Sequence, residues 1–81
     1  MNLTQQFGQA VRHHREVLDI SQEEFAHRAG LDRTYVSGIE RGHRNPSLRT
    51  IERLATALGV GIDALFRTVI EIGHTRKRAA K

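Results

Sequence analysis

The 81-residue chain has no cysteine and no tryptophan, a single proline, and only three phenylalanines and one tyrosine. The absence of cysteine excludes disulfides and thiolate zinc sites, and it fits a reducing compartment. No apolar run is long enough to cross a bilayer, and the N-terminal MNLTQQFGQA lacks the basic and then apolar pattern of a secretory signal. These absences predict a cytoplasmic protein without a membrane segment. The length of 81 residues predicts a single domain with little room for a catalytic cleft.

The formal net charge of +4 arises at the C-terminus, where Arg76, Lys77, Arg78 and Lys81 supply four of the thirteen basic residues. The other nine basic side chains are balanced by nine acidic ones. We therefore divide the chain into a domain over residues 1–75 and a basic tail over residues 76–81. We expect the tail to be solvated and to raise non-specific affinity for polyanions. In the neutral domain, any affinity for a polyanion must come from where the arginines lie.

The fold class that the sequence predicts is all-α. Apolar residues recur near a helical period in several segments, and each segment has end signals. The first predicted helix runs from Thr4 to about Leu18 and is ended by Asp19. The second is opened by a capping box of Ser21 and Glu24 and ended by Gly30, and the third covers residues 33–41 and is capped by Asp32. The fourth is opened by Pro46 and Ser47 and ended by Gly59, and a last helix follows residues 61–63. Leu18, Leu48, Phe66 and Val69 are among the side chains expected to face the core.

The segment 68–72 (TVIEI) is rich in β-branched residues and could form an edge strand. Strand signals are otherwise nearly absent from the chain. We therefore favour continuation of the last helix.

Residues 21–46 contain two capped helices joined by a tight turn at Gly30, which is the pattern of a helix-turn-helix unit. In such units the N-terminal residues of the second helix contact base edges in the major groove. Arg33 can donate two parallel hydrogen bonds to guanine, and Thr34 can bond a base or touch a thymine methyl group. Ser37 and Gly38 keep the outer face of this helix short, which would allow a close approach to a groove. Double-stranded DNA is therefore the predicted partner.

Contacts to the DNA backbone are predicted beside this helix. Gln22 lies in the first turn of the preceding helix, where its side chain and the free amides could hold a phosphate oxygen. Arg44 and Asn45 follow the recognition helix and are placed for a backbone or minor-groove contact.

The chain resembles the lambda-repressor-like, or Xre-type, DNA-binding domains from Gln22 to Phe66. The matching segments are Ser21–Glu24, Ala29–Leu31, Val36–Gly42, Asn45–Ser47 and Leu54–Val60. The resemblance implies a five-helix domain that binds a pseudo-palindromic operator as a homodimer. Such a protein acts at the nucleoid as a repressor or other regulator of transcription, and RNA polymerase is a further possible partner. The run Leu31–Gly42, in so short a chain, is similar to the controller proteins of restriction–modification systems.

Carried onto this sequence, the resemblance implies base contacts by Arg33, Thr34 and Ser37, backbone contacts by Gln22, Tyr35, Arg41 and Arg44, and an ion pair between Arg15 and Glu40. Two of these roles have alternatives. The Tyr35 ring could pack in the core, and Arg41 could instead interact favourably with the C-terminal end of its helix. The chain departs from the family pattern at Asp19, where glycine is common, and at Gly61, where a capping Ser or Thr is usual.

No catalytic or metal-binding arrangement is recognisable in the sequence. His13 and His14 are adjacent and point apart on a helix, and His27 has no ligand partner at metal spacing. Ser21 and Ser37 lack a His/Asp arrangement for nucleophilic chemistry, and no glycine-rich phosphate loop is present. The sequence predicts a protein that is not an enzyme and uses no cofactor or metal.

Apolar residues continue past Phe66 through Val69, Ile70 and Ile72, which is more than a small helical core needs. We predict that these three residues form a two-fold dimer contact; the alternative is that Ile70 or Ile72 folds back on the first helix. A dimer would hold two recognition helices about 34 Å apart, to read half-sites one helical turn apart. An antitoxin or other module that holds a protein partner is the competing function. RNA binding is less well supported, because so few aromatic residues give no stacking platform.

Overall fold

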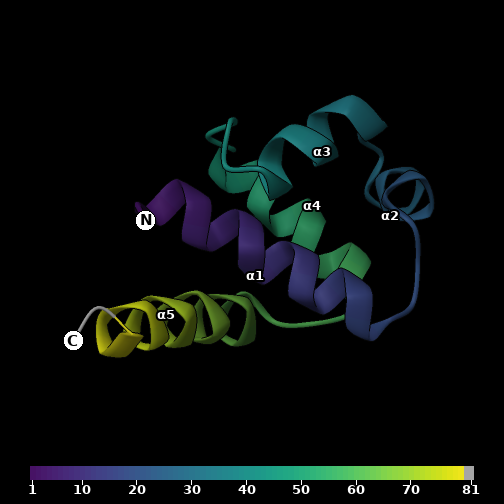
Figure 1. Ribbon diagram of the computed structural model, residues 1–81. Coiled ribbons are helices and arrows are strands. Elements are labelled where there is room, and N and C mark those ends of the chain that lie inside the picture. Colours follow the sequence, from purple (N-terminus) through teal and green to yellow (C-terminus); the bar gives the residue numbers. More distant parts are fainter. Residues whose placement is uncertain (80–81) are drawn as a thin grey trace.

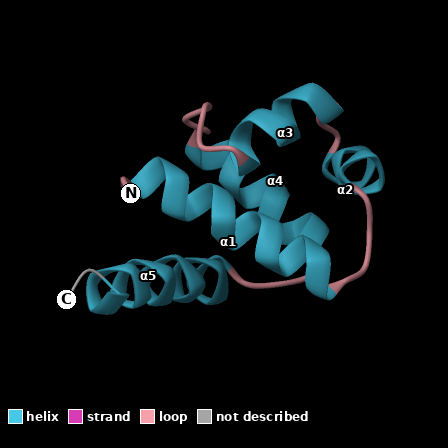
Figure 2. Cartoon of the chain, in the orientation of Figure 1, coloured by secondary structure: helices cyan, strands magenta, loops and turns pink. Residues whose placement is uncertain are grey.

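The computed structural model describes the main chain of residues 1–79 and the side chains of residues 1–74. It contains five α-helices: α1 (Leu3–Val17), α2 (Gln22–Ala29), α3 (Arg33–Glu40), α4 (Leu48–Leu58) and α5 (Ile62–Ala79) (Figure 1). Loops join the helices, and no strand occurs among the described residues (Figure 2). The all-α prediction is confirmed, and residues 68–72 continue α5.

The helices are arranged so that α3 lies at an edge of the molecule. α1 packs along α5, with the N-terminus of α1 and the C-terminal end of α5 at the same end of the pair (Figure 1). α1 also contacts α3, and α4 contacts both α2 and α5. One long side of α3 therefore faces away from the other helices.

The interior is a single apolar cluster to which every helix contributes. Its largest fully buried side chains are Val11, Phe25, Val36, Ile39, Leu54, Leu65 and Val69. Burying one aliphatic or aromatic side chain of this size stabilises a fold by about 1.5–3 kcal/mol. Because Val36 and Ile39 belong to the cluster, the core itself fixes the position of α3.

The start of α2 differs from its predicted capping box. Ser21 Oγ accepts the Glu24 amide at 3.0 Å, as expected. The Glu24 carboxylate, however, pairs with Arg28 at 2.9 Å instead of reaching back to Ser21, so only half of the capping box forms. A complete capping box, which the sequence reasoning missed, opens α1 between Asn2 and Gln5.

The end of α1 follows the prediction. Asp19 adopts a left-handed conformation with φ of 57°, and its amide donates to the Glu16 carbonyl at 3.0 Å. An aspartate tolerates this region better than most side chains, although glycine fits it with less strain.

Two side chains expected in the core lie at the surface instead. Leu18 follows α1 and is 41% exposed, and Leu48, the first residue of α4, is 84% exposed. Val69, which was also expected in the core, is only 2% exposed because the core of its own chain covers it, and this leaves little of its surface for the predicted dimer contact. Ile70 is 56% exposed, whereas Ile72 packs partly against the core.

The predicted basic tail begins inside α5. The main chain of residues 76–79 is helical, while the roles expected of the tail's basic side chains lie outside the described residues. Across the part of the chain that the structure describes, no helix is both long and apolar enough to cross a membrane.

Candidate nucleic-acid interface

The turn between α2 and α3 is held by local hydrogen bonds. Gly30 adopts the left-handed conformation with φ of 69°, and the Leu31 amide donates to the Ala26 carbonyl at 2.9 Å. Asp32 then caps α3 by accepting the Thr34 amide at 3.1 Å. Because Leu31 also packs against the core, the turn presents α3 in one defined orientation.

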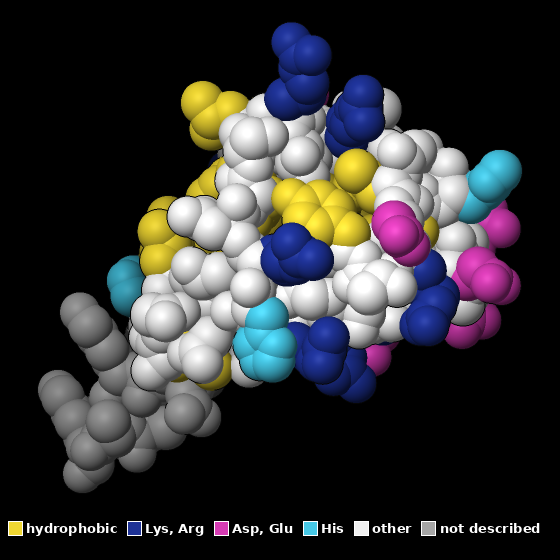
Figure 3. Space-filling model, turned by 90° about the horizontal axis from the view of Figure 1, so that it is seen from above, with side chains coloured by type: hydrophobic (Ala, Val, Ile, Leu, Met, Phe, Trp, Pro, Cys, Tyr) yellow, Lys and Arg dark blue, Asp and Glu magenta, His cyan; other side chains and the backbone are white. Residues whose placement is uncertain are grey.

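The two sides of α3 have different chemistry. Val36 and Ile39 are fully buried, whereas Arg33 and Thr34 are exposed and Ser37 is half-buried. Seen from above, this side of the molecule carries arginine side chains around a central hydrophobic side chain, and its acidic side chains gather toward the α2 end (Figure 3). The three side chains predicted to contact bases therefore share the outward side of a helix that the core holds in place.

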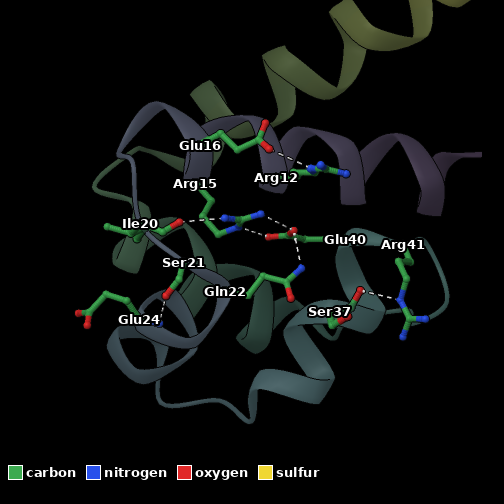
Figure 4. Close-up of polar contacts among 10 residues, drawn as sticks. All are labelled: Arg12, Arg15, Glu16, Ile20, Ser21, Gln22, Glu24, Ser37, Glu40 and Arg41. Atoms are coloured by element: carbon green, nitrogen blue, oxygen red, sulfur yellow. Dashed lines mark hydrogen bonds and ion pairs between the residues drawn. The ribbon is translucent and has the colours of Figure 1, made fainter.

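A buried ion pair joins α1 to the C-terminal end of α3 (Figure 4). Arg15 Nε lies 2.7 Å from Glu40 Oε2, and Arg15 Nη2 lies 3.1 Å from Glu40 Oε1. The two side chains are only 13% and 3% exposed, respectively. The ion pair implied by the family resemblance is thus present, with two parallel hydrogen bonds.

Two further groups complete this polar cluster. Arg15 Nη1 donates to the Ile20 carbonyl at 2.8 Å, and Gln22 Nε2 donates to Glu40 Oε1 at 3.0 Å (Figure 4). The hydrogen bond to Glu40 raises the pKa of Arg15 above its ordinary value, and burial opposes this effect. The cluster therefore links α1, α2 and α3, and it neutralises the Glu40 carboxylate beneath the outward side of α3.

The geometry changes the interpretation of Gln22. Its side chain is half-buried and engaged with Glu40, so it is not the free phosphate-binding arm that the sequence suggested. An amide group has two N–H donors, and the bond to Glu40 uses one. The second hydrogen remains able to donate to a phosphate while the first holds the side chain in place.

Arg41, at the end of α3, is exposed, and its Nε donates to the Ser37 carbonyl at 3.3 Å. The Ser37 carbonyl also accepts the Arg41 main-chain amide at 3.1 Å, so the side chain adds a second, charged donor at the C-terminal end of α3, which is the structural role considered above. The other guanidinium nitrogens of Arg41 make no hydrogen bond to described residues. Both of the predicted roles are therefore compatible with its position.

Tyr35 and Arg44 lie against each other on the outward side of α3. The Arg44 Cζ atom lies 5.4 Å from the centroid of the Tyr35 ring, within cation–π range. Tyr35 is half-buried and packs partly against the core, while Arg44 is exposed. Gly38 does not contribute to a short outer face, as the sequence suggested, because it is buried and the stem of Arg44 lies against it.

Asn45 is exposed in the loop between α3 and α4, beside an apolar hollow of about 90 Å³. The hollow is lined by Leu3, Thr4, Phe7, Asn45, Pro46, Ile51 and Phe66. Sequence reasoning missed this feature, because its walls come from α1, α4, α5 and the loop before α4.

The histidines are distributed without a common site. His14 Nε2 lies 2.8 Å from Thr68 Oγ1, which links α1 to α5. No group of three or more His, Cys, Asp or Glu side chains that could hold a metal ion occurs in the described part of the chain.

These features, a five-helix fold with a capped turn and an outward polar helix, define a helix-turn-helix protein. A family model described as helix-turn-helix matches residues 11–65. The chain belongs to this helix-turn-helix family. It is 50% identical over 60 residues to the control protein C.BamHI of Bacillus amyloliquefaciens, an alignment that covers 73% of this chain and 74% of that protein.

Solved structures of restriction–modification controller proteins share the fold. The structure of C.AhdI from Aeromonas hydrophila superposes with a TM-score of 0.74 at 49% identity, over 78% of this chain and 94% of that one. C.Esp1396I, crystallised as a tetramer in complex with its natural 35-base-pair operator, superposes with a TM-score of 0.83 at 30% identity, over 89% of this chain and 95% of that one.

Proposed function

We propose that the protein is a sequence-specific regulator of transcription that binds double-stranded DNA by placing α3 in the major groove. The observation that carries the proposal is the outward side of α3, where Arg33 and Thr34 stand exposed above a core-anchored helix. Base recognition needs side chains held in a fixed register, and here the core and the Arg15–Glu40 pair hold the helix. Arg33, Thr34 and Ser37 are the proposed base contacts.

The proposed backbone contacts surround α3. Arg41, Arg44 and Asn45 are exposed at its C-terminal end, and Gln22 supplies one free amide hydrogen at the start of α2. Arginine and amide donors of this kind bind phosphate oxygens and fix the register of the protein on the duplex. Tyr35 belongs to the same group through Arg44, whose guanidinium carbon lies 5.4 Å from the centroid of the Tyr35 ring.

The likeness to controller proteins supports a narrower proposal, which is control of a restriction–modification operon. A regulator of this kind acts by binding at the nucleoid in the cytoplasm and not by catalysis. Contact with RNA polymerase would follow from binding near a promoter.

We further propose that the protein binds its operator as a homodimer, through a surface that keeps Ile70 of the predicted Val69–Ile72 segment and is centred on Leu48 and Leu3. Leu48 is 84% exposed and follows Pro46, which lies in the wall of the apolar hollow, by two residues. Leu3 is 64% exposed at the rim of the same hollow. Ile70 extends this surface along α5, one turn beyond Phe66. A protruding side chain beside a hollow is self-complementary about a two-fold axis, since each Leu48 can enter the hollow of the other copy.

The competing function is a protein-interaction module, which would use the same apolar surface to bind a different protein. Only the DNA-binding function enriches particular sequences from a pool of duplexes, so such a selection separates the two functions. The experiment is to select duplexes from a random pool with the full chain and sequence the bound fraction. The proposal predicts enrichment of an inverted repeat whose half-sites lie one helical turn apart. A bound fraction with no sequence enrichment would contradict it.

A further inference from the structure

Gly38 lies in the interior of α3, where a glycine needs an explanation. Its main chain is helical, so it does not serve a turn, and glycine is among the least favourable residues in a helix interior. Gly38 is also buried. The reason for a glycine at this position must therefore be something that occupies the space of its missing side chain.

That space holds the stem of Arg44. A Cβ atom built on Gly38 would lie 2.8 Å from Arg44 Cγ, 3.5 Å from its Nε and 3.7 Å from its Cδ. No separation as short as the first occurs between real atoms of this kind, so any larger residue at position 38 must displace the arginine. The arginine is exposed and able to move away, so the helix itself need not change.

The loop after α3 directs Arg44 back over the helix. Gly42 adopts a left-handed conformation with φ of 77°, and its amide donates to the Ile39 carbonyl at 3.0 Å. The His43 amide donates to the Gly38 carbonyl at 2.8 Å. These two bonds form a Schellman closure, which anchors the main chain one residue before Arg44.

The far end of Arg44 is held by an aromatic ring. Its Cζ atom lies 5.4 Å from the centroid of the Tyr35 ring, three residues before Gly38 and hence on a neighbouring part of the α3 surface. Tyr35 is itself fixed by packing against the core. The arginine is thus held at its stem by Gly38 and at its guanidinium by Tyr35.

We propose that Gly38 and the Tyr35 ring form a cradle that presets Arg44 for DNA, so that both act as positioning residues through the arginine. The inference rests on the proposed DNA-binding function. An arginine that is ordered before binding loses less conformational freedom when it meets the duplex, which strengthens binding without any new contact. Tyr35 in this account works through the face of its ring and not through its hydroxyl.

The test compares Gly38→Ala with Gly73→Ala, which adds the same methyl group to a helix remote from α3. Affinity is measured by fluorescence anisotropy on the selected operator duplex and on a scrambled duplex. Gly38→Ala should weaken binding of a half-site by about threefold to tenfold, the range expected when one side chain must be ordered on binding. Its melting temperature should stay equal or rise, because alanine favours the helix. Gly73→Ala should bind as the wild type does.

Three results would overturn the cradle. In an Arg44→Ala background, Gly38→Ala should have no further effect, so an undiminished loss there would mean that the methyl group meets DNA directly. Tyr35→Phe should keep the affinity and Tyr35→Leu should lower it; an equal loss in both would assign the role to the hydroxyl. Wild-type affinity in Gly38→Ala, with a clear loss in Arg44→Ala, would show that presetting is unimportant.

A measurement without DNA separates this inference from the proposed function. In the NMR spectrum of the free protein, the Tyr35 ring should shift the Arg44 side-chain proton resonances upfield, and both Gly38→Ala and Tyr35→Leu should remove that shift. A normal Arg44 spectrum in the wild type would contradict the cradle even if the protein binds its operator. Failure of the wild type to distinguish operator from scrambled duplex, with the shift present, would contradict the proposed function and with it the role of the cradle in binding.

Discussion

Arg15 on α1 and Glu40 at the end of α3 form a buried two-bond ion pair, with an Nε–Oε2 distance of 2.7 Å. The pair lies directly beneath the helix end that carries Arg41 and the loop to Arg44. It therefore couples the stability of the fold to the placement of the proposed DNA-binding side chains. Removing either partner leaves the other charge buried without compensation.

Glu40→Gln should destabilise the protein by about 3 kcal/mol, the lower end of the range for breaking a buried pair. The matched control is Arg12→Ala, since Arg12 and Glu16 form a pair on α1 whose side chains are 62% and 55% exposed. Loss of that exposed pair should cost less than about 1 kcal/mol. Urea unfolding followed by circular dichroism measures both changes. Equal losses in the two variants would mean that burial of the Arg15–Glu40 pair is unimportant.

Gln22→Ala should weaken the operator and the scrambled duplex by the same factor. In the proposed interface, the amide hydrogen of Gln22 that is not bonded to Glu40 donates to a phosphate, and phosphate contacts carry no direct sequence information. The variant should also lose about 1 kcal/mol of stability with its hydrogen bond to Glu40. Anisotropy titrations on the two duplexes provide the comparison, and a loss confined to the operator would contradict a phosphate role.

The stability of the protein should fall as the pH drops below about 6.5, in part through His14. Burial, with a smaller effect from His13, lowers the pKa of His14 below its ordinary value of 6.5. The unfolded chain therefore binds a proton at His14 more readily than the folded protein does. The contribution of His14 to the free energy of unfolding is fully present above the pKa of the unfolded chain, and it is lost as the pH falls through the pKa of the folded protein. The neutral ring bridges α1 to α5 through Thr68 Oγ1.

His14→Gln removes the titrating group and keeps a polar side chain at this contact. Between about pH 7.5 and 5.5, its free energy of unfolding should change less than that of the wild type. His27→Gln, on the exposed side of α2, is the control and should follow the wild-type curve. A wild-type slope in His14→Gln would exclude His14 as a source of the pH dependence.

Leu48→Asp should convert the proposed dimer to a monomer, because it places a charge in the proposed apolar contact. The control is Val17→Asp, which changes a 70% exposed side chain at the opposite end of α1 from Leu3. Sedimentation equilibrium gives the mass of each variant in solution. A dimeric Leu48→Asp protein, or a monomeric Val17→Asp protein, would exclude the proposed surface.

The sequence predicted the helices well because their signals are local. Asp32 and Ser47 cap their helices as expected, and Asp19 and Gly30 end theirs in the left-handed conformation. Such signals depend on residues three or four positions apart, and they need no knowledge of the rest of the fold. The outward position of Arg33 followed in the same way from the apolar period of α3.

The errors arose where contacts join separate elements. The periodicity that placed Val69 in an apolar segment could not tell whether its own core or a second copy covers it. Gln22 looked free until Glu40, from another helix, came within hydrogen-bonding distance. Gly38 carried a signal that could have been used, since a glycine in a helix interior is unfavourable and points to a close neighbour.

The central claim is that Arg33 reads a base from the first turn of α3. The most direct measurement is the affinity of wild type and Arg33→Ala for a set of operator duplexes in which each base pair is changed in turn. Arg33→Ala should lose discrimination at one base pair in each half-site, worth about 1–3 kcal/mol, and should keep the wild-type circular dichroism spectrum. The same pattern of base preferences in the wild type and in Arg33→Ala would contradict it.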